Sequence, residues 1–149
     1  MSELRFSVHA EIKGKGRARA NWRQRVVHTP AATVRYEKMV AAEATEAMRR
    51  QGVAKIEGAV RMDLIIRLTP PQSASKAKQA SMLSGEIRPT KKPDVDNVVK
   101  AIGDALNGVA FVDDVQIASL HVERIYAPSE GLDVVIRLAE KPAWMAKSE

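Results

Sequence analysis

Alternating apolar and polar residues mark four stretches of the chain as strands. From residue 4 to residue 12, every second side chain is apolar, which is typical of a strand with one buried face. The same alternation predicts three later strands, over residues 59–68, 115–126 and 132–138. Residues 26–28 form a short apolar run that allows one further short strand.

A spacing of three to four residues between apolar side chains predicts helices between these strands. The first helix opens at Thr29-Pro30, because threonine caps helices and proline suits a first turn, and it stops at Gly52. A short helix begins at Ser73 or Ser75 and runs to about residue 83. A third helix covers 95–106, where Asn107-Gly108 stops it.

Interleaved strands and helices indicate a mixed α/β (α+β) domain. The chain has 149 residues, with no internal repeat and no dividing linker, and this length fits one domain spanning residues 1–149. We expect a mixed sheet of about four strands, packed against two to three helices. Residues 142–149 are predicted to be a loose tail.

Positive charge is concentrated in two segments of a chain whose formal charge is +6. Residues 1–30 hold seven Lys and Arg against two acids, and residues 73–92 hold five against one. Residues 13–25 have no apolar period and two glycines, so they predict a flexible basic loop. Such segments favour nucleic-acid partners. The charge by itself is equally consistent with a basic surface that is only solvated. The residues expected to bind DNA are Lys13, Lys15, Arg17, Arg19, Arg23, Lys91 and Lys92.

Several classes of protein are excluded by composition. The chain has no cysteine, so it forms neither disulfides nor thiolate metal sites. It lacks an apolar run of about 18 residues, so we expect no membrane partner. The first residues lack a signal-peptide pattern, and we therefore expect a cytoplasmic protein.

Carboxylates cluster where the second basic segment ends. On a helix over 95–106, apolar residues form one face, and Asp96, Lys100 and Asp104 form a row on the open side. Asp94 precedes the first turn. Capping a helix needs only one aspartate, so capping does not explain why Asp94 and Asp96 occur together. A calcium loop is excluded because the chain has Val98 and Val99 where that motif needs a ligand and a glycine.

A second acidic pair, Asp113-Asp114, stands at the start of the strand predicted over 115–126. Alone it is typical of a solvated turn. Together with the first cluster in a basic chain, it predicts a site for Mg²⁺ or Mn²⁺, which prefer carboxylate oxygens. Lys100 would orient or deprotonate an attacking water, or stabilise the phosphate; a simple Asp96–Lys100 surface pair is the alternative.

These residues resemble the RusA family of Holliday-junction resolvases. The resemblance rests on D-V-D-N-V-V-K at 94–100, D-A-L-N-G at 104–108 and D-D-V-Q at 113–116. It implies a homodimeric, RusA-like α/β endonuclease that cuts four-way DNA junctions symmetrically with Mg²⁺ or Mn²⁺, in recombination and repair, with a prophage-derived role. It also implies that Asp94, Asp96 and Asp114 are the catalytic metal ligands and that Lys100 assists catalysis. Supporting roles fall to Asn97, Asp104 and Asp113.

Other functions remain open at this level. A flap or other branched-DNA endonuclease needs the same residues, and so does an RNA-directed nuclease. A non-catalytic DNA-binding module gains nothing from three carboxylates beside phosphate. Aromatic residues make up 4% of the chain, which argues against single-strand binding by stacking. No pattern predicts a small-molecule substrate.

Overall fold

The computed structural model describes residues 3–14, 19–21, 26–28 and 30–146. Its main feature is a four-stranded sheet with the strand order β1-β6-β4-β5. β4 and β5 are parallel, and the other neighbouring strands are antiparallel, so the predicted mixed sheet is confirmed. The strands are β1 (Glu3–Val8), β4 (Val60–Leu68), β5 (Ile117–Tyr126) and β6 (Gly131–Leu138).

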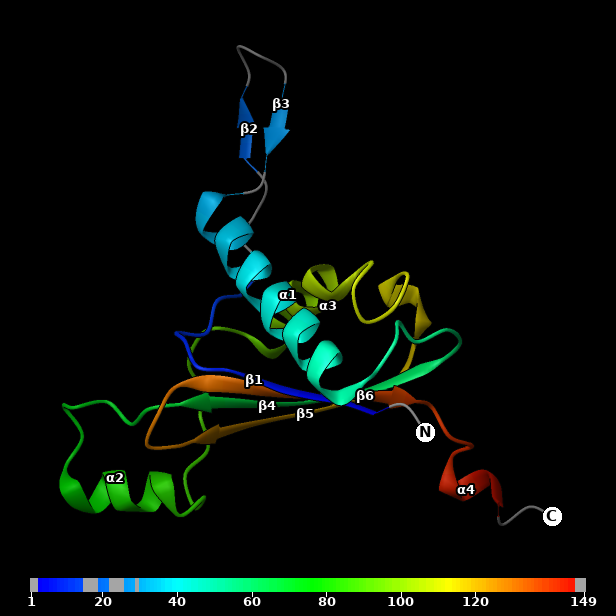
Figure 1. The fold of residues 1–149 in the computed structure, drawn as a ribbon. Coiled ribbons are helices and arrows are strands. Elements are labelled where there is room, and N and C mark those ends of the chain that lie inside the picture. Colours follow the sequence, from blue (N-terminus) through cyan, green and yellow to red (C-terminus); the bar gives the residue numbers. More distant parts are fainter. Residues whose placement is uncertain (1–2, 15–18, 22–25, 29, 147–149) are drawn as a thin grey trace.

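Two helices, α1 (Ala31–Gln51) and α3 (Val95–Leu106), cover one face of this sheet (Figure 1). They contact each other, and α1 also packs on β1. β4 alternates between buried and partly exposed residues, and its side chains on the helix-facing side are fully buried at Met62, Leu64 and Ile66. The apolar alternation thus places the core between the sheet and the two helices.

Both ends of α1 follow local chemistry. The helix begins after Pro30, which makes no side-chain cap, and Thr29 lies outside the described residues. It ends at Gly52, as predicted, because Gly52 adopts a left-handed conformation with φ 66° and its N–H bonds to the Met48 carbonyl. The short helix α2 (Lys76–Leu83) has Ser75 as its cap, with the serine hydroxyl accepting from the Lys78 N–H at 3.2 Å.

Three local predictions are wrong. The first strand ends at Val8, although Ile12 is still buried. Residues 19–21, predicted to be loop, form the strand β2 (Arg19–Asn21), which pairs with β3 (Val26–His28) in an antiparallel hairpin that stands off the body (Figure 1). Residues 143–146, predicted to be loose, form α4 (Ala143–Ala146). Backbone pairing and a single helical turn need no apolar periodicity, so the pattern could not predict either element.

The face of the sheet opposite α1 and α3 carries opposite charges at close range. Arg67 binds Asp133 at 3.1 Å, and Arg61 binds Asp63 at 3.0 Å. Each of these arginines is therefore held in an ion pair with a carboxylate. Among the described residues, no helix is long and apolar enough to cross a membrane.

Candidate active site

The helix α3 begins and ends where the sequence predicts. Its buried face includes Val98, Ile102 and Leu106, each with no exposed surface. Asp94 is the N-cap residue by position, yet its side chain makes no capping hydrogen bond. A structural role as a cap therefore does not account for Asp94, and the carboxylate is exposed at the start of the helix.

The second acidic pair forms a single turn that the sequence did not predict. Asp114–Gln116 is a 3₁₀ helix, η1, and β5 begins only at Ile117. Asp113 is its cap: the Asp113 carboxylate accepts from the Val115 N–H at 3.1 Å. The prediction that the pair opens a strand is therefore wrong, because local side-chain capping competes with strand pairing.

Gln116 fixes this turn to the body of the domain. Its side-chain oxygen accepts from the N–H groups of Val112 at 2.7 Å and Asp113 at 3.1 Å. Its side-chain nitrogen donates to the carbonyls of Ile56 at 3.0 Å and Gly58 at 2.9 Å. Gln116 closes the D-D-V-Q motif, for which the sequence predicts no role at this residue, and its long-range bonds show that it positions the acidic turn.

The turn packs against α3 at Gly103. A Cβ atom at Gly103 would lie 3.5 Å from both the Cβ and the Oδ2 of Asp114. Gly103 is buried on the side of α3 that was expected to be open, because Asp114 covers it. A glycine inside a strongly periodic helix was the available signal of close approach.

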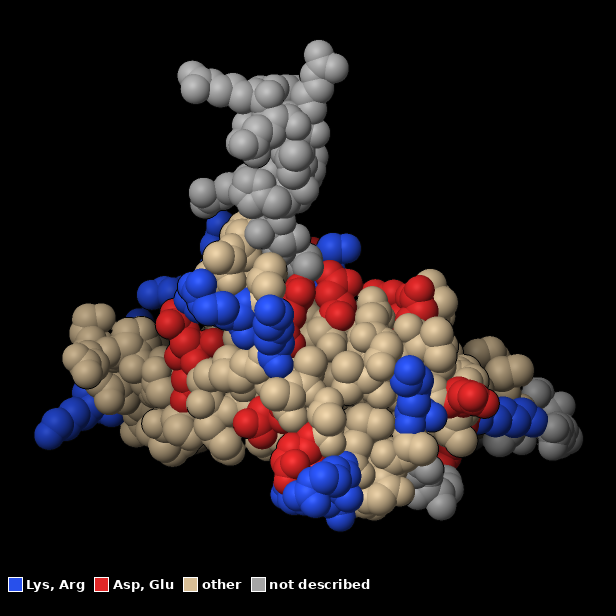
Figure 2. Space-filling model, turned by 45° about the horizontal axis from the view of Figure 1, so that its top comes forward, with Lys and Arg blue, Asp and Glu red and all other residues tan. Residues whose placement is uncertain are grey.

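Asp96, Lys100 and Asp114 line one open cleft. Gly103 forms part of the same wall, and the remaining lining is apolar: Val95, Val99, Ile117 and Leu120. Three of the four residues predicted to be catalytic are therefore brought together from two separate motifs. Asp94 does not line this cleft but lies one residue before α3 begins. Figure 2 shows groups of acidic side chains on the side of the molecule that carries α1 and α3, with lysines and arginines among them.

Negative charge accumulates around Asp114. A side-chain hydrogen bond with Asp113, burial, and the charges of Asp113 and Asp104 raise the pKa of Asp114, whereas the charge of Lys100 acts in the opposite direction. The same hydrogen bond and the N–H of Val115 lower the pKa of Asp113. The two carboxylates thus act on each other at close range, and a cation placed nearby would relieve the repulsion between the negative charges.

The donor set fits a hard divalent cation, because every acidic ligand offers only carboxylate oxygens. Within the described ranges, no three Asp, Glu or His side chains are gathered closely enough to hold a metal ion. The metal-binding role of Asp94, Asp96 and Asp114 therefore stays a prediction. Mg²⁺ commonly takes one or two carboxylates and completes its shell with water and substrate phosphate.

Residues from both basic segments lie near the start of α3. A Cβ atom at Gly14 would lie 3.0 Å from the Cβ of Asn97 and 3.5 Å from the Cβ of Pro93, so the chain after Lys13 passes over the start of α3. Lys91 and Lys92 are exposed just before it. Lys15, Arg17 and Arg23 lie outside the described residues, and Arg19 belongs to β2.

Most of the chain matches one known protein family. Residues 10–137 match the family model described as Endodeoxyribonuclease RusA. The chain belongs to the RusA family. The match contains every residue that lines the cleft and ends before α4. The chain is also similar to "Uncharacterized protein YqaN" of Bacillus subtilis (strain 168), with 36% identity over 141 residues, covering 92% of this chain and 97% of that protein.

Proposed function

We propose that this RusA-family chain is a Mg²⁺-dependent, structure-specific endodeoxyribonuclease that resolves Holliday junctions by symmetric paired nicking. The observation that carries the proposal is the cleft in which Asp96, Lys100 and Asp114 meet. Two carboxylates and the positively charged Lys100 side chain on one wall suit the hydrolysis of a phosphodiester. Carboxylates beside phosphate would not help a protein that only binds DNA. Mn²⁺ would serve the same ligands.

Each residue has a role in the proposed reaction. Asp94, Asp96 and Asp114 would hold the ion, which when bound makes water nucleophilic and neutralises charge on the phosphate. Lys100 adds a positive charge on the same wall, where it stabilises the scissile phosphate or orients the attacking water. Asp113 and Gln116 are positioning residues, because they hold the turn that carries Asp114.

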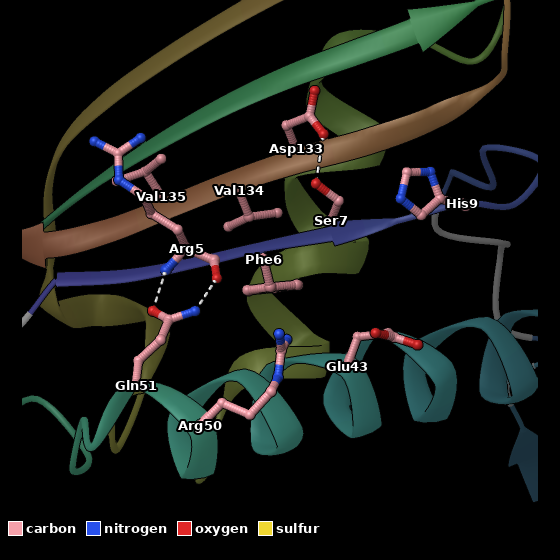
Figure 3. Close-up of a pocket in the computed structure, with 10 residues that line it drawn as sticks. All are labelled: Arg5, Phe6, Ser7, His9, Glu43, Arg50, Gln51, Asp133, Val134 and Val135. Carbon is pink, nitrogen blue, oxygen red and sulfur yellow. Dashed lines mark hydrogen bonds between the residues drawn. The ribbon is translucent and has the colours of Figure 1, made fainter.

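Paired nicks require two active sites, and we therefore propose a homodimer. One edge of the sheet is closed: the Gln51 amide accepts from the Arg5 N–H at 3.1 Å and donates to the Arg5 carbonyl at 2.6 Å (Figure 3). Gln51 thus occupies backbone groups of β1 that a partner strand would need.

At the opposite edge, β5, the hydrogen bond that covers the strand among the described residues lies in its second half. There the Arg124 carbonyl accepts from the Arg88 side chain at 2.7 Å. Along its first half, Leu120 is 46% exposed and continues the apolar lining of the cleft with Ile117. We propose that a second copy of the chain contacts this part of β5, because an exposed apolar strand edge is otherwise a liability.

The test separates chemistry from binding. Asp94→Asn, Asp96→Asn and Asp114→Asn should each abolish Mg²⁺-dependent cleavage of a labelled four-way junction. Junction binding should survive, or tighten as repulsion from phosphate falls. Glu86→Gln is a matched control, because this exposed acid lies between α2 and α3 and outside the cleft, and the variant should cut normally. Near wild-type cleavage by one of the three variants would remove that residue from the site.

A further inference from the structure

A second pocket lies where the connector between α2 and α3, residues 84–94, meets the end of β5. Its volume is about 270 Å³. α2 contacts β5, and Figure 1 shows α2 near the end of that strand. Three of the residues that line the pocket are basic, Lys78, Arg88 and Lys91, and none is acidic. Of these three, only Lys91 was expected to have a role.

This pocket is separate from the cleft of Asp96, Lys100 and Asp114. No residue lines both of them. β5 contributes its last residue, Tyr126, to the pocket and Leu120 to the cleft, and six strand residues span about 20 Å. A ligand in the pocket therefore leaves the proposed active site free.

Hydrogen bonds hold both walls of the pocket in place. On one wall, the Gln79 side chain donates to the Ala74 carbonyl at 2.8 Å and so fixes the segment before α2. On the other wall, the Arg88 side chain donates to the Arg124 carbonyl at 2.7 Å, and the Arg124 side chain donates to the Lys91 carbonyl. The connector is thus attached to β5 without a ligand, which reduces the entropy lost when a ligand binds.

The pocket has an excess of positive charge. Arg88 is paired with Glu123, so these two side chains add no net charge. Lys78 and Lys91 are exposed, and within the described residues their ammonium groups form no ion pair. Glu86, the nearest acid along the connector, is exposed and does not line the pocket. Two lysines are therefore available to an anion.

Each wall also offers a hydroxyl group beside its lysine. Ser73 stands with Lys78 on the wall formed by α2 and the segment before it, and Thr90 stands with Lys91 on the connector. Both Ser73 and Thr90 are exposed. Donors on two sides of a pocket suit a tetrahedral anion better than a flat carboxylate, and lysine is a common phosphate ligand.

We propose that this pocket binds a phosphate group. Lys78 and Lys91 contact the phosphate from the two walls, and the hydroxyls of Ser73 and Thr90 donate to its oxygens. The phosphate comes either from the backbone of DNA, a source that rests on the proposed function, or from free phosphate or a nucleotide, which does not. The chemistry of recognition is the same for both sources.

A titration of the ¹⁵N-labelled protein with inorganic phosphate, followed by NMR at constant ionic strength, tests the site. The amide signals of residues 73–91 should shift and reach saturation. Replacing both lysines, Lys78→Gln with Lys91→Gln, should weaken phosphate binding about tenfold, because two exposed charge contacts are lost. Lys55→Gln is the matched control and should bind as the wild type does, because Lys55 is exposed and lies between α1 and β4, outside the pocket.

A linear DNA duplex identifies the source of the phosphate. If DNA supplies it, the duplex shifts the same amide signals. In fluorescence anisotropy, the double variant then flattens the slope of log affinity against log salt by about 0.9, because one phosphate contact is lost. If a small molecule supplies it, inorganic phosphate alone shifts the signals and the slope keeps its wild-type value. Either result supports a phosphate site.

Two results would overturn the proposal. One is a phosphate titration in which the amide signals of residues 73–91 do not saturate. The other is a double variant that binds phosphate as tightly as the wild type. Failure of the wild-type protein to cut junctions would instead refute the proposed function. The phosphate titration does not depend on cleavage, so the two failures are distinguishable.

Discussion

Removing the side chain of Gln116 should loosen the acidic turn and destabilise the fold. Gln116→Ala deletes four hydrogen bonds, two to N–H groups of residues 112 and 113 and two to carbonyls of residues 56 and 58. A protein hydrogen bond contributes about 0.5–1.5 kcal/mol net. Water can replace part of the loss, because three of the four bonds join exposed groups. We therefore expect a loss of about 2–3 kcal/mol in the free energy of unfolding.

Urea unfolding followed by circular dichroism measures this loss. For a domain of this size, the expected loss corresponds to a fall in Tm of about 4–12 °C. Gln72→Ala is the matched control, because Gln72 is exposed and forms no hydrogen bond in the described structure, and its effect should stay within about 0.5 kcal/mol. If Gln116→Ala unfolds within about 0.5 kcal/mol of the wild type, the account of the turn is refuted.

Three further predictions concern stability, DNA binding and assembly. Gly103→Ala should stabilise the protein by about 0.5–1 kcal/mol in urea unfolding, because alanine favours helix and its Cβ meets Asp114 at an ordinary 3.5 Å; a destabilised variant would show that the approach is tighter. Sedimentation should give about twice 16.4 kDa for the wild type and for Leu83→Glu, but a monomer for Leu120→Glu; a wild-type monomer that still makes paired cuts would defeat the dimer argument. In filter binding, the slope of log affinity against log salt should flatten by up to about 3–4 when four basic residues become alanine, and an unchanged slope would show that the segment is only solvated. These residues are Lys13, Lys15, Arg17 and Arg19.

The parts of the fold that were predictable are those governed by burial. Residues 95–106 form a helix with the predicted bounds, because its apolar stripe is continuous and Asn107-Gly108 stops it. β4 alternates as expected, since one of its faces packs against the helices. By contrast, β2 is formed by backbone pairing, η1 by side-chain capping, and α4 is a single helical turn. Elements this short leave no apolar period in the sequence.

The candidate site was predictable in its residue types but not in its assembly. Asp96 and Lys100 share one helix, so their proximity follows from the helical repeat. The approach of Asp114 to Gly103 depends on bonds from Gln116 to residues 56 and 58, about sixty residues earlier in the chain. No spacing rule predicts such contacts, because they arise only when separate elements pack together.

The central claim is tested most directly by cleavage of a four-way junction, a flap and a linear duplex side by side, each with Mg²⁺ and with EDTA. We expect the junction to be cut by paired, symmetric nicks in Mg²⁺, with slower cutting of the flap and none of the duplex. EDTA should abolish every cut. Equal cutting of all three substrates, or junction cleavage that persists in EDTA, would contradict the account.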